Sequence, residues 1–246
     1  MPATSDIFFE MLPLYLMMAI GYLAGRLFKP DTKSIATLTV FVLSPIVFML
    51  TVAQMEFSIG ALLGPFIVFA LSVLVSFCVL GLGRQVSAGK TPYLMALISG
   101  TSNWGYFGIS IAFVLFEPAV VGLYVLIALG TIVFENSFGI YYASRGQSSP
   151  LESFKNVFRY PVLYAIIIGV FLSYLEYPPP ILSGTFFEYF KGAYIVLGMM
   201  MVGLALADME RLTVNIGFLA STFGVRFLIW PALAIGVVWL DKNVIG

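Results

Sequence analysis

Histidine is absent from this chain of 246 residues, and only 10% of the residues are charged. The absence of histidine excludes zinc proteases with an HExxH motif and membrane proteases that use a serine–histidine pair. No lysine lies in the middle of an apolar segment, which excludes a retinal Schiff base, and no glycine-rich phosphate loop is present. We therefore expect no catalytic centre, no bound metal and no cofactor.

Basic residues and cysteine are also scarce. Twelve Lys and Arg residues balance twelve Asp and Glu residues, and the absence of a basic tail argues against nucleic acid as a partner. The single cysteine, Cys78, lies in the apolar run FCVLGLG and is interpreted as a small buried hydrophobe. The N-terminal MPATSD lacks the positive charge of a signal peptide, so we interpret the first apolar segment as a retained helix.

Apolar residues make up 61% of the chain, more than a soluble domain needs. A membrane-spanning helix requires roughly 20 mostly apolar residues. We predict an all-α membrane protein, a polytopic bundle of eight transmembrane helices. The predicted segments are 7–28, 35–55, 60–82, 92–115, 119–143, 158–176, 188–207 and 214–239.

Positive charges occur in alternate loops, those that follow the first, third, fifth and seventh segments. By the positive-inside rule these loops are cytoplasmic. The sequence therefore predicts a multi-pass protein of the cell membrane with its N-terminus outside. The residues concerned are Arg26, Lys29, Lys33, Arg84, Lys90, Arg145, Lys155, Arg159 and Arg211.

The first and sixth segments resemble each other at a constant offset. Pro13 matches Pro161, and Gly21 matches Gly169, with a weaker echo between the ends of the second and seventh segments. Since the first segment starts outside and the sixth starts inside, the repeat is inverted. Inverted repeats are typical of secondary transporters.

The fourth segment carries small and polar residues, GTSNWGYFG at 100–108, at mid-depth. Non-helical backbone at that depth must be satisfied by protein or line a cavity, and Gly105 loosens the helix. Ser102 and Asn103 can bond freed backbone groups or a ligand. Because a broken helix exposes a partly positive end that can bind a carboxylate, we predict a substrate site here. Trp104 either stacks on the substrate or fills space. The alternative for the whole cluster is a helix–helix contact through small residues.

Five further polar or kink-forming residues have more than one interpretation. Ser44 and Pro45 form either a kinked wall beside the site or only a structural kink. An ionisable group inside a membrane helix is a functional hypothesis by default. Glu135, next to Asn136, either carries a proton for coupling or pairs with a cation near the cytoplasmic leaflet. Arg226 attracts an anion, pairs with Glu135, or extends to the cytoplasmic face.

The segment SNWGYFGISIAFVLF at 102–116 resembles the broken fourth helix of the auxin efflux carrier family. The resemblance covers essentially the whole chain. It implies ten helices in two inverted five-helix repeats, in which helices four and nine break and cross near the midplane. It also implies that an organic anion binds at this crossing and that the protein forms a dimer. Three further segments resemble other helices of the family: FVLSPIVFM at 41–49, RYPVLYAIIIGVFLS at 159–173 and GMMMVGLALADM at 198–209.

The sequence departs from this family pattern after its eighth segment. We divide it into a first repeat at 1–145, a cytoplasmic linker at 146–157 and an incomplete second repeat at 158–246. We expect the ninth and tenth helices of the family pattern to come from a downstream segment or from another chain. The predicted function is that of a secondary transporter of organic acid anions, with an organic or auxin-like carboxylate as substrate and the lipid bilayer as surroundings. The alternatives are a non-transporting membrane sensor or assembly subunit and a membrane-embedded transferase.

Overall fold

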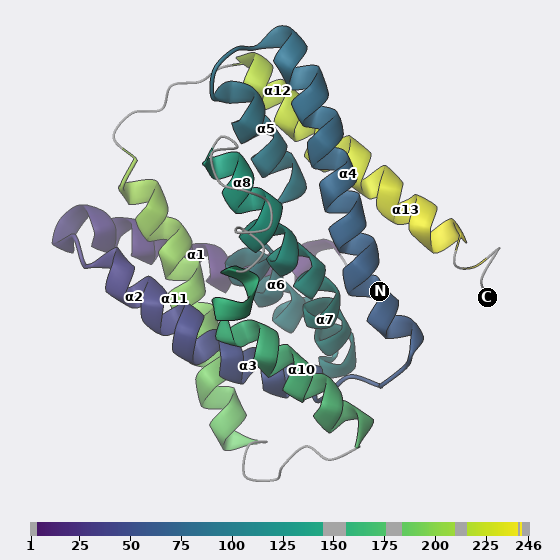
Figure 1. Ribbon diagram of the computed structural model, residues 1–246. Helices are drawn as coiled ribbons and strands as arrows, with labels where there is room; N and C mark the ends of the chain where they lie inside the picture. The colour runs from purple at the N-terminus through teal and green to yellow at the C-terminus, as the bar shows by residue number, and fades with distance from the viewer. Residues whose placement is uncertain (1–3, 145–155, 176–183, 210–215, 241, 243–246) are drawn as a thin grey trace.

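The computed structural model describes residues 4–144, 156–175, 184–209, 216–240 and 242, and within these ranges the chain is helical without a strand (Figure 1). Six helical segments are long and apolar enough to cross a membrane, by length and composition. They indicate a multi-pass membrane protein. These segments are Phe8–Phe28, Thr32–Val52, Gly60–Gln85, Pro118–Ala143, Thr185–Ala207 and Ile216–Leu240.

Several of these segments consist of two helices joined by a wide, π-helical turn. Such turns occupy Thr39–Leu43 between α2 and α3, Glu135–Gly139 between α7 and α8, and Val225–Ile229 between α12 and α13. The helices of the six segments are α1 (Thr4–Phe28), α2 (Thr32–Leu38), α3 (Ser44–Val52), α4 (Leu63–Val86), α7 (Pro118–Phe134), α8 (Ile140–Ala143), α11 (Thr185–Ala207), α12 (Ile216–Gly224) and α13 (Trp230–Leu240).

The remaining two predicted segments take other forms. The segment predicted at 92–115 is divided into α5 (Thr91–Gly100) and α6 (Ile109–Leu115), with a π-helical turn at Trp104–Gly108 before α6. The segment predicted at 158–176 contains α10 (Pro161–Tyr174), whose 14 residues fall short of the roughly 20 that a full span requires.

Local sequence accounts for several helix boundaries. Pro118 and Pro161 begin α7 and α10, where the missing N–H of proline costs no hydrogen bond. Asp31 caps α2 by accepting from the backbone N–H of Lys33 at 3.2 Å and from the hydroxyl of Ser34. The hydrogen bond from Ser34 lowers the pKa of the Asp31 carboxyl from its usual value.

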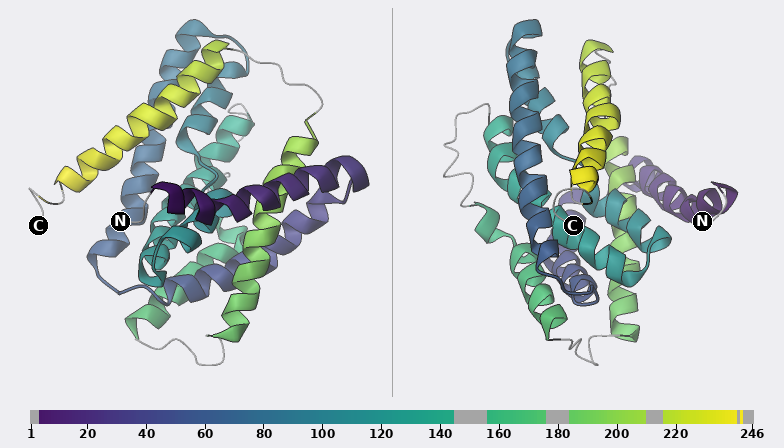
Figure 2. Two further views of the ribbon diagram at one scale, coloured as in Figure 1. Left: turned by 180° about the vertical axis from the view of Figure 1, so that it is seen from behind. Right: turned by 90° about the vertical axis from the view of Figure 1, so that its right-hand side faces the viewer.

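Two pairs of helices cross at glycines. On α1, a Cβ atom at Gly21 would collide with the backbone of Met200 on α11, and Figure 2 shows the two helices crossing. On α10, a Cβ atom at Gly169 would lie 2.6 Å from the carbonyl oxygen of Met49 on α3, which lies beside α10 in Figure 1. Glycine therefore permits backbone-to-backbone contact at both crossings.

The main core lies where α3 and α7 meet α10 and α11. It contains fully buried side chains from all four helices, such as Val47, Val125, Ile166 and Tyr194. Many large apolar side chains are exposed, Phe66 with 72% of its surface among them, as expected for helices that face lipid.

Three sequence predictions need comment here. Cys78 is exposed on α4, so its interpretation as a buried residue is wrong; an apolar run in a membrane helix can face lipid as well as protein. Three of the cations used to predict the orientation, Arg145, Lys155 and Arg211, lie outside the described residues, as does most of the predicted linker. The orientation itself stays a prediction.

Candidate functional site

The fourth predicted segment breaks inside the stretch where the sequence predicted a break. α5 ends at Gly100, and the next residue, Thr101, has extended backbone with φ −109° and ψ 164°. Helical structure resumes at Trp104, where the N–H of Gly108 donates to the carbonyl of Asn103 at 2.9 Å. The predicted loss of regular hydrogen bonding within 100–108 is confirmed.

Side chains from the last described span bind the carbonyl groups that the break leaves free. The guanidinium Nη2 of Arg226 donates to the carbonyl of Ile98 at 2.7 Å and also to the carbonyl of Thr101. The indole N–H of Trp230 donates to the carbonyl of Ser99 at 2.8 Å. A cation is favoured at this partly negative helix end, so Arg226 caps α5.

This arrangement corrects one of the predicted interpretations of Arg226. The structure describes both Arg226 and Glu135, and no ion pair joins them. The guanidinium is engaged with backbone carbonyls instead, and Arg226 and Glu135 line different cavities. Arg226 is half-buried.

On the other side of the break, the first turn of the resumed helix lacks a side-chain cap. Asn103 occupies the capping position, but its side chain accepts no hydrogen bond from that turn. The first N–H groups of a helix have no partner within the helix, so those that follow Asn103 can bind a ligand. The carbonyl of Trp104 accepts from the hydroxyl of Tyr124 at 3.2 Å, and a Cβ atom at Gly108 would collide with that hydroxyl. Gly108 is therefore required by the close approach of Tyr124.

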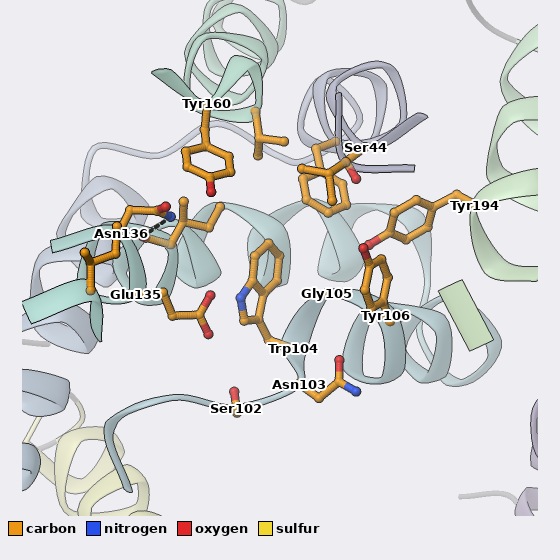
Figure 3. Close-up of a pocket in the computed structure, with 15 residues that line it drawn as sticks. Ser44, Ser102, Asn103, Trp104, Gly105, Tyr106, Glu135, Asn136, Tyr160 and Tyr194 are labelled. Carbon is orange, nitrogen blue, oxygen red and sulfur yellow. Dashed lines mark hydrogen bonds between the residues drawn. The ribbon is translucent and has the colours of Figure 1, made fainter. Parts of the chain in front are cut away.

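A cavity of about 460 Å³ lies beside the break, and we call it the first cavity (Figure 3). Three of the wide helical turns border it, which is notable because π-helical turns recur at functional sites. Seven of the nine residues predicted for the site line this cavity. They are Ser44, Ser102, Asn103, Trp104, Gly105, Glu135 and Asn136.

Trp104 lies in the middle of the residues that line the first cavity. Its ring lies 5.5 Å from that of Phe48, centroid to centroid, so it both packs in the core and borders the first cavity. In Figure 3 the nitrogen edge of the indole faces the carboxylate of Glu135. Asn136, next to Glu135, donates to the carbonyl of Ile132 at 2.9 Å and is held by its own helix.

Ser44 and Pro45 have separate roles. The hydroxyl of Ser44 donates to the carbonyl of Thr39 at 2.7 Å across the wide turn, and Ser44 lines the first cavity. Pro45 occupies the start of α3 and is not a lining residue. Because proline cannot donate a backbone hydrogen bond, the turn before it widens and brings Ser44 to the cavity.

The side chain of Asn103 does not face the interior of the bundle. It is exposed, and in Figure 3 its amide points away from Trp104 and Glu135. The reason is that the Trp104 ring takes the interior side of the chain at the break. Ser102 is also exposed and borders two cavities.

The tyrosines around the first cavity were not among the residues predicted from the sequence. Tyr160, Tyr106 and Tyr194 line it from three different elements, and the rings of Tyr106 and Tyr194 lie 6.4 Å apart. Tyr194 is almost completely buried. A tyrosine in the middle of an apolar helix was the available signal, because its hydroxyl needs a partner there.

A second cavity, of about 410 Å³, lies against the same break and is bordered by Arg226 and Trp230. Ser102 and Trp104 line both cavities. Within the described part of the chain, no cluster of three His, Cys, Asp or Glu side chains is arranged to hold a metal ion.

No model of a known protein family matches the chain, and no curated protein matches it either.

Proposed function

We propose that the chain is a secondary transporter of organic acid anions, similar to auxin efflux carriers, in the cell membrane with its N-terminus outside. The observation that carries this proposal is a helix that breaks next to a cavity of about 460 Å³ and begins again without a side-chain cap. A carboxylate can accept hydrogen bonds from the N–H groups at that partly positive end. The cavity volume is typical of small-molecule sites.

The depth of the break supports a transport site. Gly100 packs against the ring of Phe134. Phe134 lies 16 residues after Pro118 and 9 residues before Ala143 in one spanning segment, so the break is far from both ends of that segment. Non-helical backbone at such a depth is expected only where protein or a water-filled cavity satisfies it.

The two glycine crossings support the proposed inverted repeat. If the first segment corresponds to the sixth and the second to the seventh, the contact of α1 with α11 corresponds to the contact of α10 with α3. Gly21 and Gly169, which match at the constant sequence offset, both contact backbone of the partner helix. A two-fold axis relating two repeats would generate such a pair of contacts.

Glu135 bears on how the anion would bind. An ionised carboxylate in the first cavity would repel an organic anion, and repulsion is strong where water is largely excluded. We therefore propose that a proton on Glu135 and an anion in the cavity favour each other. This linkage makes transport dependent on the proton gradient.

Flux through reconstituted protein tests the function. Purified protein in liposomes is given labelled malate, malonate or indole-3-acetate under an imposed pH gradient and membrane potential, with protein-free liposomes as the control. Uptake above that control supports the carrier. Binding without flux would favour a sensor or assembly subunit, and turnover of lipid would favour a transferase.

Cross-linking in native membranes tests the proposed homodimer.

A further inference from the structure

The second cavity shares its wall with the first. Ser102 and Trp104 border both cavities, and both belong to the break or to the turn that follows it. The two spaces therefore meet at the break between α5 and the turn that precedes α6.

The two cavities occupy successive lengths of the bundle. Along the segment Pro118–Ala143, the second cavity contacts Tyr124 and Thr131, whereas the first contacts Ile132 and Glu135. At 1.5 Å per residue, the 11 residues from Tyr124 to Glu135 cover roughly 16 Å along the helix axis. One cavity thus lies toward the Pro118 end and the other toward the Ala143 end.

Residues on other helices place the two cavities at the same two ends of the bundle. The second cavity contacts Val68, which lies five residues into α4. The first cavity contacts Tyr160 and Val162 at the beginning of α10. It also contacts Val40, in the first half of the segment Thr32–Val52.

The second cavity contains the groups that an organic anion requires. Arg226 contributes a guanidinium, which carries five N–H donors in total. Among the described residues, only its Nη2 is engaged, with the carbonyls of Ile98 and Thr101. The hydroxyl-bearing residues Ser72 and Thr131 also line this cavity.

We propose, resting on the proposed transport function, that the second cavity continues the path of the anion and that the indole of Trp104 is the wall between the two halves of the path. The carboxylate of the substrate binds Arg226 in the second cavity and the free N–H groups after Asn103 in the first. Displacement of the Trp104 ring joins the two cavities.

Cysteine labelling tests this path without knowledge of the substrate. The exposed Cys78 is replaced by Ala, and Val40→Cys and Val68→Cys then place matched thiols in the first and second cavities. Ser58→Cys and Ala88→Cys, in the loops on either side of α4, report the two faces of a sealed vesicle. A membrane-impermeant thiol reagent is applied to one face at a time.

We expect Val40→Cys to react from the face that labels Ala88→Cys, and Val68→Cys to react from the face that labels Ser58→Cys. Replacement of Trp104 by Ala should raise the rate from the opposite face by about tenfold, because labelling follows the fraction of molecules with an open path. Replacement by Phe, which keeps a ring, should change the rates little.

Two results would overturn the proposal: labelling of both cavity cysteines from the same face, or unchanged sidedness in a Trp104→Ala protein that elutes as a folded monodisperse species. If Trp104→Ala fails to fold, the sidedness of Val40→Cys and Val68→Cys with Trp104 intact decides the question. Because labelling needs no substrate, a failure of the transport assay leaves this result readable.

Discussion

Gly108 shows how a single residue supports the break. Its missing side chain leaves room for the Tyr124 hydroxyl, which donates to the carbonyl of Trp104. We expect Gly108→Ala to destabilise the protein by about 1–3 kcal/mol, because the added methyl would collide with the Tyr124 hydroxyl and displace it from the carbonyl of Trp104. Thermal unfolding in detergent measures the effect.

A matched control for this prediction is Gly236→Ala on α13, where an added Cβ would meet no atom within 4 Å. Removal of the obstructing hydroxyl in the double variant Gly108→Ala, Tyr124→Phe should recover part of the loss. Equal unfolding temperatures for Gly108→Ala and Gly236→Ala would contradict the proposed contact.

In the proposed mechanism, proton coupling depends on Glu135. Glu135→Gln keeps the shape of a protonated acid but cannot ionise. In the unchanged protein, anion binding should weaken as the pH rises, since ionisation of Glu135 adds repulsion in the first cavity. In Glu135→Gln, binding and uptake should become independent of pH.

The control is Glu188→Gln, which removes a carboxylate that pairs with Lys191 at 2.6 Å and does not line the first cavity. Uptake by this variant should keep its dependence on pH. An unchanged pH profile in Glu135→Gln would remove Glu135 from the mechanism.

At the scale of elements, α5 depends on the span α12–α13 for its C-terminal cap. Hydrogen bonds to charged groups stabilise by about 1.5–3 kcal/mol, so Arg226→Gln should destabilise the protein by an amount in that range. Arg226→Lys should be milder, because a lysine keeps the positive charge but cannot present the planar fork of a guanidinium. Chemical unfolding and proteolytic sensitivity near Thr101 measure both.

Arg84 offers a comparison within the same chain. Its guanidinium donates to the hydroxyl of Tyr93 at 3.0 Å on an exposed surface rather than to the end of a broken helix. Arg84→Gln should therefore cost little. If Arg84→Gln destabilises the protein as much as Arg226→Gln, the loss in Arg226→Gln cannot be assigned to the cap of α5.

For the whole molecule, the proposed inverted repeat predicts that two distant glycines are equivalent. Gly21→Ala and Gly169→Ala should both destabilise by about 1–3 kcal/mol, because each methyl would be forced against backbone of a crossing helix. Gly192→Ala on α11, which has open space at that position, is the control. A large effect at one glycine and none at the other would argue against equivalent crossings.

Membrane orientation is the second property of the whole molecule that can be tested. The positive-inside rule predicts that the loop with Lys90 is cytoplasmic. In intact cells, Ala88→Cys should then be protected from an impermeant thiol reagent, whereas Ser58→Cys should react. The reverse pattern would invert the proposed topology.

The sequence by itself determined where the helices are and where one of them breaks. Hydrogen bonds within a helix join residues close in sequence, so long apolar runs predicted eight segments, six of which are long and apolar enough to cross a membrane. The cluster at 100–108 predicted the interruption. Ser44, Glu135 and Asn136 could also be selected as site candidates, because polar groups are rare and costly in a membrane helix.

Only the tertiary structure decided what those polar groups contact. The carbonyls of Ser99 and Thr101 find their donors on Trp230 and Arg226, more than 120 residues later in the chain. Packing of Val225 and Trp230 with Met95 on α5 brings these residues together, and no local pattern encodes that contact. The exposure of Asn103 has the same origin, since the interior position at the break is taken by Trp104, whose ring packs against Phe48 on a neighbouring helix.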